Sequence, residues 1–310
     1  MRNISSNNQY LLTVIIPFYN IGKQINKCIK RLNKIQDEKV EIIFIDDGST
    51  DRIKKNIYFF IEKKSNYKLL KLRNNKGPGI ARNKGILFSN GKFVLFLDSD
   101  DKLKINNFYK LLSFLKRNTK KDIVFYNYLK KKNKYKINLS IKKLNKNNII
   151  KFFLKTELEM CSNFYCFRKE FLKKYNIKFD SGYYEDIVFM LKNFFFMKKF
   201  SLFDKRVYEK IDNKKSITNT YSEKHVKDFL KSVSSKVKFF KMIIKNKNLN
   251  NDLQFGLRGD YIFAKKIFNK YSLPKKSYIS INKFFEKIIN KKYKMITTYD
   301  KKVMKELFNK

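Results

Sequence analysis

The chain has 310 residues, which is enough for one large α/β domain or two smaller ones. Hydrophobic residues make up 43% of it and aromatic residues 16%, so a disordered polybasic chain is excluded. The net charge of +45 indicates an anionic partner: a nucleic acid, a nucleotide, a phospholipid surface or an acidic glycan. Lysine supplies most of this charge and is spread along the whole chain, which favours compositional bias with weak anion attraction over a dedicated nucleic-acid surface.

The three cysteines, Cys28, Cys161 and Cys166, do not suggest a disulfide framework. The single histidine, His225, is far from them in sequence, so a zinc site is not expected. No apolar run reaches the roughly 18 residues that span a membrane, and the N-terminus lacks a small-residue cleavage site. We therefore expect a cytoplasmic protein without a signal peptide, and peripheral binding to the inner face of a membrane is compatible with this.

The first hundred residues alternate short apolar runs with stretches of helical periodicity. The expected strands lie at residues 12–16, 40–45, 68–72 and 93–97. The expected helices lie between them, at residues 21–35, 51–62 and 79–90. Strands that alternate with helices of this length predict βαβ units and an α/β fold with a mostly parallel sheet.

The rest of the chain is less regular. Expected helices lie at residues 102–116, 148–155, 168–175 and 185–199, and expected strands at 122–128 and 134–141. From about residue 221 the chain predicts lysine-rich helices with apolar stripes. We therefore divide the chain into two halves of one α/β domain and a helical C-terminal region, at residues 10–116, 117–220 and 221–310.

Acidic residues follow two of the predicted strands: Asp46 and Asp47 after the second, and Asp98 and Asp100 after the fourth. Ligands of open α/β sheets bind outside the carboxyl ends of the strands. Asp98 and Asp100 are alternate residues, so both carboxylates can point into one pocket and hold a hard divalent ion beside substrate phosphates. A solvated turn that caps the following helix is the alternative for each pair.

Four motifs stand in order within about 90 residues: Pro17-Phe18-Tyr19-Asn20, Ile45-Asp46-Asp47-Gly48-Ser49, Ala81-Arg82-Asn83-Lys84-Gly85 and Asp98-Ser99-Asp100-Asp101. Together they resemble the family 2 glycosyltransferases, inverting enzymes of the GT-A fold. The resemblance continues more faintly through Tyr184-Glu185-Asp186, Tyr208 and Ser216-Ile217-Thr218. It covers roughly residues 11 to 220 and implies a Rossmann-like, mixed but mostly parallel sheet flanked by helices.

The resemblance also implies roles for the first half, as the part that binds a nucleotide-sugar donor. Pro17 and Tyr19 would lie along the nucleotide base, and Asp47 would accept a hydrogen bond from it, with Asp46 in support. Arg82 would sit near the donor diphosphate or sugar.

The remaining implied roles concern the ribose, the metal and the acceptor. Asp98 and Ser99 would line the ribose and sugar, and Asp100 would coordinate Mn²⁺ or Mg²⁺. Asp186 resembles the catalytic base that deprotonates the acceptor hydroxyl, with Glu185 in support. An acidic pair at a helix N-terminus is the alternative explanation of Glu185-Asp186.

The expected function is transfer of a single sugar from a nucleotide diphosphate sugar, with UDP as the expected nucleotide, to a glycan or lipid-linked glycan acceptor in surface polysaccharide biosynthesis. The absence of Trp and of transmembrane helices disfavours a processive synthase. A nucleotidyltransferase is the alternative, but it should carry a Gly-rich loop where this chain has Phe18-Tyr19-Asn20-Ile21. A basic nucleic-acid-binding protein is the other alternative, and we expect no nucleic-acid partner. The lysine-rich C-terminal region fits either an anionic membrane surface or ordinary bundle helices.

Overall fold

The computed structural model describes residues 10–22, 24–51, 58, 61, 64–130, 133–135, 145, 148–154, 158–211, 222–243, 247–271 and 273–289. The described residues belong to two compact units. The first comprises residues 1–146, 161–182 and 192–213, and the second comprises residues 147–160, 183–191 and 214–310. The division of the chain into residues 10–116, 117–220 and 221–310 stays a prediction.

The first unit contains one sheet of nine strands, and eight of them follow the spatial order β3-β2-β1-β4-β8-β6-β9-β5. Its parallel part is formed by four strands: β1 (Tyr10–Phe18), β2 (Val40–Asp46), β3 (Tyr67–Lys71) and β4 (Gly91–Phe96). Parallel strands are usually buried on both faces, and β1 and β2 follow that rule. Every residue of β2 is buried, and so is every residue of β1 except Leu11.

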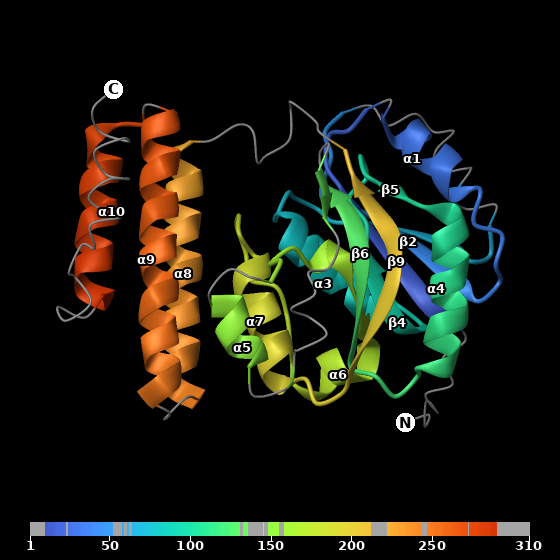
Figure 1. Ribbon diagram of the computed structural model, residues 1–310. Helices are drawn as coiled ribbons and strands as arrows, with labels where there is room; N and C mark the ends of the chain where they lie inside the picture. Colours follow the sequence, from blue (N-terminus) through green and yellow to red (C-terminus); the bar gives the residue numbers. More distant parts are fainter. Residues whose placement is uncertain are drawn as a thin grey trace, which may run out of the picture. The chain divides into compact units, whose positions relative to one another are not determined.

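The helices of the parallel part cover both faces of the sheet. α1 (Gln24–Leu32) and α4 (Ile105–Arg117) lie on one face, and α3 (Pro78–Phe88) lies on the other (Figure 1). The chain steps from β1 to β2 in one direction and from β3 to β4 in the opposite direction, so right-handed crossovers place α1 and α3 on opposite faces. α1 buries the apolar residues that its sequence periodicity predicts: Ile25, Cys28, Ile29 and Leu32.

The first strand extends beyond the predicted residues 12–16, because β1 continues through Pro17 to Phe18, with Pro17 opposite Ile45 of β2. Successive residues of a strand direct their N–H groups to opposite sides, so residues 15 and 17 direct theirs to the same side. The carbonyl of Ile15 accepts from Leu97 on the β4 side, so the nitrogen of Pro17 faces the same side. The β1–β4 ladder has already ended at Ile15, and proline there removes no ladder hydrogen bond.

The second part of the sheet is mixed. β8 (Tyr165–Arg168) runs antiparallel to both β4 and β6 (Ile123–Lys130). β9 (Phe200–Lys210) runs parallel to β6, and the two-residue strand β5 (Lys102–Leu103) is antiparallel to β9. β7 (Asn133–Tyr135) pairs with β6, and α6 (Lys169–Lys174) follows β8. The sequence did not predict β5, β8 or β9, and the helix expected from residue 102 begins at Ile105.

The second unit is helical. It contains α5 (Ile149–Leu154), the start of α7 (Asp186–Phe196), α8 (Glu223–Ile243), α9 (Lys247–Lys270) and α10 (Lys275–Ile288). A Cβ on Gly256 of α9 would lie 2.6 Å from the carbonyl oxygen of Leu154, so glycine there permits α5 to pack closely. The predicted lysine-rich helices after residue 221 are thus confirmed. No described helix is both long enough and apolar enough to cross a membrane.

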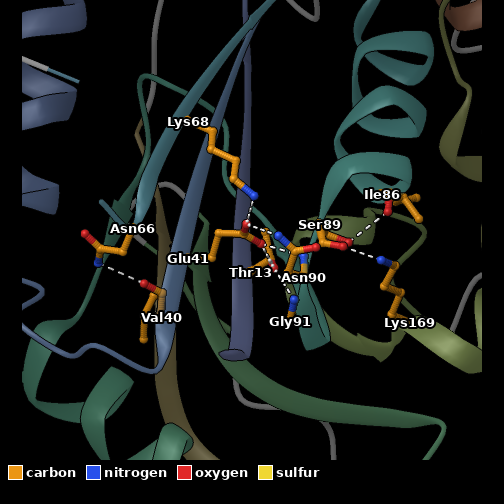
Figure 2. Close-up of polar contacts among 10 residues, drawn as sticks. All are labelled: Thr13, Val40, Glu41, Asn66, Lys68, Ile86, Ser89, Asn90, Gly91 and Lys169. Carbon is orange, nitrogen blue, oxygen red and sulfur yellow. Dashed lines mark hydrogen bonds and ion pairs between the residues drawn. The ribbon is translucent and has the colours of Figure 1, made fainter. Parts of the chain in front are cut away.

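A buried carboxylate connects the strands at the amino ends of the parallel sheet. Glu41 of β2 is fully buried and accepts hydrogen bonds from Thr13 Oγ1 (2.6 Å), Lys68 Nζ (2.6 Å) and the backbone N–H of Asn90 (2.7 Å). Figure 2 shows Glu41 between these partners. Since Thr13, Lys68 and Asn90 come from β1, β3 and the turn before β4, one side chain of β2 joins three strands and this turn.

Most of the predicted helix 51–62 lies outside the described residues, as do residues 136–141 of the predicted strand 134–141 and the motif Ser216-Ile217-Thr218. The helices predicted at 148–155, 168–175 and 185–199 are confirmed as α5, α6 and α7, with slightly different ends.

Candidate functional site

The parallel strands β1, β2 and β4 end at the same edge of the sheet, and the predicted donor-binding residues gather there. Pro17 is the second-last residue of β1, Asp46 ends β2, and Asp98 follows β4. Asp46 and Asp47 are buried, Ser99 and Asp100 are half-buried, and Tyr19 is 43% exposed. The site therefore combines an accessible aromatic ring with carboxylates held inside the sheet edge.

Hydrogen bonds tie the loops after β1 and β2 together. The side chain of Asn20, which has a φ of 48°, accepts from the backbone N–H groups of Thr50 (2.8 Å) and Asp51 (3.1 Å). Asp51 in turn accepts from the N–H of Gly22 (2.7 Å). Asp46 accepts from the N–H of Ser49 (2.8 Å), which fits the turn given above as the alternative explanation of this acidic pair.

Asp47 connects β2 to the loop before α3. Its two carboxylate oxygens accept from the N–H groups of Lys76 (2.9 Å) and Gly77 (2.8 Å). Burial raises the pKa of Asp47 above its usual value, and these two hydrogen bonds only partly offset that effect. The carboxylate therefore fixes the 76–77 loop, whatever role it has toward a ligand.

Gly48 has a φ of +75°, and a Cβ there would lie 2.6 Å from the carbonyl carbon of Asn74 and 2.8 Å from the nitrogen of Asn75. We expect Gly48→Ala to cost about 1–3 kcal/mol of unfolding free energy and to weaken nucleotide binding, because the backbone of the site must move. Chemical unfolding and calorimetric titration with UDP measure both effects. Gly259→Ala is the control, because nothing lies within 4 Å of that Cβ. Equal stability of the two variants would contradict this expectation.

An ion pair joins α3 to the loop after β4. The Nη2 of Arg82 lies 2.9 Å from the Oδ1 of Asp98, and the side chain of Arg82 is 5% exposed. Burial favours the neutral acid, but the charges of Arg82 and Lys210 outweigh it and hold the pKa of Asp98 below its usual value. The Arg82 guanidinium also lies 5.5 Å from the ring centre of Phe179, which stabilises a buried cation.

A buried hydrogen-bond cluster centres on Tyr208 of β9. Its hydroxyl donates to Asp101 Oδ2 (2.6 Å) and accepts from Asn163 Nδ2 (2.9 Å) and from the N–H of Asp98 (3.3 Å). Burial raises the pKa of Asp101 to about 7, and the negative charge of Asp98 adds to this. The cluster fixes the Asp98–Asp101 loop from β9 and from the segment before β8, both distant in sequence.

Two cations near this loop were not identified from the sequence. Lys210 ends β9; partial burial disfavours its charge, but electrostatic interactions with Cys161, Asp98 and Asp101 outweigh this and raise its pKa. Arg31 at the end of α1 donates to the carbonyl oxygens of Asp100 (3.0 Å) and Asp101 (3.1 Å). Lys210 is thus a charged side chain beside the acidic loop, as a site for an anion requires.

The carboxylates of the Asp98–Asp101 loop suit a metal that takes most of its ligands from substrate. Asp98 is engaged by Arg82, and Asp101 is engaged by Tyr208 and by the N–H of Ile211 (2.7 Å). Asp100, which is half-buried, is the third carboxylate of the loop. Within the part of the chain that the structure describes, no three His, Cys, Asp or Glu side chains form a metal cluster. This donor set fits Mg²⁺ or Mn²⁺ held by one carboxylate together with phosphate oxygens.

Glu185 and Asp186 lie in the second unit, where Asp186 is the first residue of α7. Two residues of α8 form hydrogen bonds with Tyr183 and Tyr184, which directly precede this acidic pair. Asp228 accepts from the N–H of Tyr183 (3.0 Å), and Ser232 Oγ donates to the carbonyl of Tyr184 (3.0 Å).

Aromatic contacts add to this support. The ring of His225 stacks on Tyr183 at 4.2 Å, and Phe229 contacts the ring of Tyr184 at 5.0 Å. Tyr184 has a φ of 62°, which costs about 1–2 kcal/mol for a residue with a Cβ. The contacts with α8 therefore stabilise a strained turn directly before the acidic pair.

We expect Asp228→Ala to lower turnover about tenfold with little change in UDP affinity, because it frees the turn that positions Asp186. Steady-state kinetics that separate kcat from the donor KM measure this. Asp252→Ala on α9 removes the same charge from the same unit and should leave kcat unchanged. A matching loss in both variants would exclude a positioning role for Asp228.

Comparisons with known proteins agree with this fold. The profile described as Glycosyl transferase family 2 matches residues 13–212. The chain therefore belongs to glycosyl transferase family 2.

Individual relatives cover part of the chain. TuaG of Bacillus subtilis (strain 168), whose name places it in teichuronic acid biosynthesis, is 32% identical over 105 residues, or 34% of this chain and 42% of that protein. Among the first relatives found, the aligned segments span 44%, 39% and 37% of their own lengths, so the chain covers less than half of each.

Solved structures support the GT-A fold over nearly the whole chain. Staphylococcus aureus TarS 1–349 in complex with UDP-GlcNAc is 20% identical, with a TM-score of 0.71 over 91% of this chain and 82% of that one. The mannosyltransferase PcManGT of Pyrobaculum calidifontis, in complex with GDP-Man and Mn²⁺, is 13% identical, with a TM-score of 0.51. The match covers 99% of this chain and 90% of that one. At these identities the likeness concerns the fold. The predicted fold class, a mostly parallel mixed sheet with flanking helices and a helical C-terminal region, is confirmed.

Proposed function

We propose that this chain transfers a single sugar, with inversion, from a UDP-sugar to a hydroxyl of a glycan or lipid-linked glycan acceptor. The observation that carries the proposal is the group of charges at the carboxyl edge of the sheet, where Arg82 and Lys210 face the Asp98–Asp101 loop. Cations beside carboxylates suit a donor that carries a diphosphate and sugar hydroxyls. UDP as the nucleotide is supported by the UDP-GlcNAc complex of TarS, and a cell-surface polysaccharide as the product by the name of TuaG.

In this proposal Pro17, Tyr19 and Asp47 contact the base, and Asp98 and Ser99 contact the ribose and sugar. Arg82 and Lys210 add positive charge near the diphosphate. A divalent ion bound at Asp100 would neutralise the leaving group. Asp186 takes the proton of the acceptor hydroxyl as its oxygen attacks the anomeric carbon, and UDP leaves with the electrons of the broken C–O bond.

A thermal-shift and hydrolysis screen across UDP-, GDP- and CMP-sugars tests the proposal. UDP with Mn²⁺ should raise the melting temperature, while a short DNA duplex at equal ionic strength should not. Asp100→Ala should abolish the part of the shift that depends on Mn²⁺, and Asp186→Ala should retain it but lose transfer. If both variants matched the wild type with the best donor and acceptor, the assignment of the site would be wrong.

The proposal extends to the location of the reaction, an anionic membrane face that the lysine-rich helices α8–α10 contact. Flotation with phosphatidylglycerol vesicles tests this part separately, since an enzyme without membrane affinity can still transfer sugar. Failure to float at moderate salt would reject the membrane contact and leave the donor chemistry standing.

A further inference from the structure

A second cationic site lies at the opposite edge of the sheet. A cavity of about 340 Å³ is lined by Lys92, Thr119, Lys120, Asp122, Arg168, Glu170, Lys174, Tyr175, Lys198 and Lys199. All of these residues belong to the first unit. Its volume is within the range of small-molecule sites, and six of its lining residues are cations against two carboxylates.

Strand register places this cavity away from the donor site. Lys92 lies at the start of β4 and Asp98 follows the end of that strand, about 20 Å further along at 3.3 Å per residue. Arg168 pairs with Phe93 at the same end, and Lys199 immediately precedes β9. The cavity is therefore formed at the amino ends of β4, β6 and β9, separate from the Asp98–Asp101 loop.

The two carboxylates of the cavity are already used to build it. Asp122 pairs with Arg168 and accepts from the backbone N–H groups of Lys198 (2.9 Å) and Lys199 (3.0 Å). Glu170 lies 3.3 Å from the Nη1 of Arg168. Asp122 is 5% exposed, so these bonds hold the 198–199 turn and the guanidinium in fixed positions.

The remaining charge of the cavity is unbalanced. Among the described residues, no carboxylate lies within ion-pair distance of the ammonium groups at positions 92, 120, 174, 198 and 199. The buried Nε of Arg168 has no hydrogen-bond acceptor there either. Tyr175 supplies a rigid wall, because its ring stacks on Phe196 at 4.7 Å with an interplanar angle of 13°.

We propose that this cavity binds a phosphate-bearing anion, either a soluble phosphate ester or the headgroup of an anionic phospholipid. Several lysines around one arginine provide point charges and directed N–H donors for a phosphate with two negative charges. The hydroxyl groups of Thr119 and Tyr175 provide further donors. The space exceeds that of a phosphate ion, so the attached group can enter as well. The site needs no donor sugar and is independent of the proposed transfer reaction.

Calorimetric titration of the full chain with inorganic phosphate and with glycerol phosphate, at constant ionic strength, tests the proposal. The double variant Lys198→Gln/Lys199→Gln should bind about tenfold more weakly, since each lost charge contributes somewhat less than 1 kcal/mol. Lys110→Gln/Lys116→Gln removes the same charge from the exposed face of α4 and should bind within about twofold of the wild type. UDP affinity should be equal in all three proteins, which separates this site from the donor site.

Vesicles distinguish the two sources of phosphate. If glycerol phosphate displaces the protein from phosphatidylglycerol vesicles, and the Lys198/Lys199 variant binds them more weakly than the control, the cavity takes a lipid headgroup. If that variant loses affinity for glycerol phosphate but not for vesicles, the ligand is a soluble ester. Equal losses in both double variants, or no phosphate binding by the wild type, would overturn the proposal.

Discussion

Asp186→Asn is expected to lower kcat by about 10²–10⁴-fold, which is the usual contribution of a positioned general base. The amide has almost the same shape as the carboxylate but cannot take the proton of the acceptor hydroxyl. Asp186 begins α7, and α8 holds the turn before it, so the substitution should change the chemistry without moving the backbone. The donor affinity should be retained, because the residues proposed to bind UDP lie in the first unit.

Single-turnover transfer to the best acceptor, together with UDP titration, measures the two quantities separately. Glu185→Gln is the matched control, because it neutralises the adjacent carboxylate, which is buried at 9% exposure. A smaller effect of Glu185→Gln than of Asp186→Asn would support Asp186 as the base. The reverse order would transfer that role to Glu185, and normal transfer by both variants would reject an acidic base at the start of α7.

The acidic residues at the carboxyl edge of the sheet could be predicted because the pattern that places them lies within a few neighbouring residues of the chain. Four apolar runs alternate with helical periodicity, and the carboxyl ends of parallel strands lie at one edge. Asp47, Asp98 and Asp100 follow those runs directly in the chain. Their positions therefore depended only on recognising the strands.

The groups that hold this edge could not be predicted, because they come from distant segments. Tyr208 and Lys210 belong to β9, whose sequence Phe200–Lys210 mixes charged and aromatic residues without clear alternation. β9 is a strand because it pairs with β6 from its first residue to its last, with irregularities around Asn127 of β6, a tertiary contact that overrides its weak local pattern. β8 has only four residues, too few for periodicity to be read. Asp101 received no role from its sequence, although Tyr208 makes it a fixed part of the site.

The contacts between α8 and the turn at Tyr183–Tyr184 could not be predicted for a different reason. The periodicity of residues 221 onward predicts a helix and its apolar face, but not which loop that face supports. Asp228 and Ser232 lie one helical turn apart, so both reach the same side of α8 and the same turn at Tyr183–Tyr184. A pair of polar residues at this spacing beside apolar positions is the only signal that the sequence offers.

Glu41→Ala should produce the largest loss of stability, about 3–5 kcal/mol, because it leaves a lysine and several donors of the buried network without their acceptor. Glu41 is fully buried and accepts from β1, β3 and the turn before β4 (Figure 2). The ammonium group of Lys68 can be rehydrated, since its side chain is 37% exposed. Thr13 Oγ1, which is buried, would lose its acceptor inside the protein, and the N–H of Asn90 would lose a part-buried hydrogen bond.

Two further variants separate the contribution of charge from that of hydrogen bonding. Glu41→Gln keeps one acceptor oxygen and should cost about 1–3 kcal/mol, while Glu170→Ala, on a 55% exposed side chain, should cost about 0–1 kcal/mol. Urea unfolding followed by fluorescence gives all three values. Similar stabilities for the Glu41 and Glu170 variants would mean that water replaces the network. Because Glu41 lies at the amino ends of the strands, folded Glu41→Ala should bind UDP like the wild type; a parallel loss of UDP affinity would show that the two edges of the sheet are coupled.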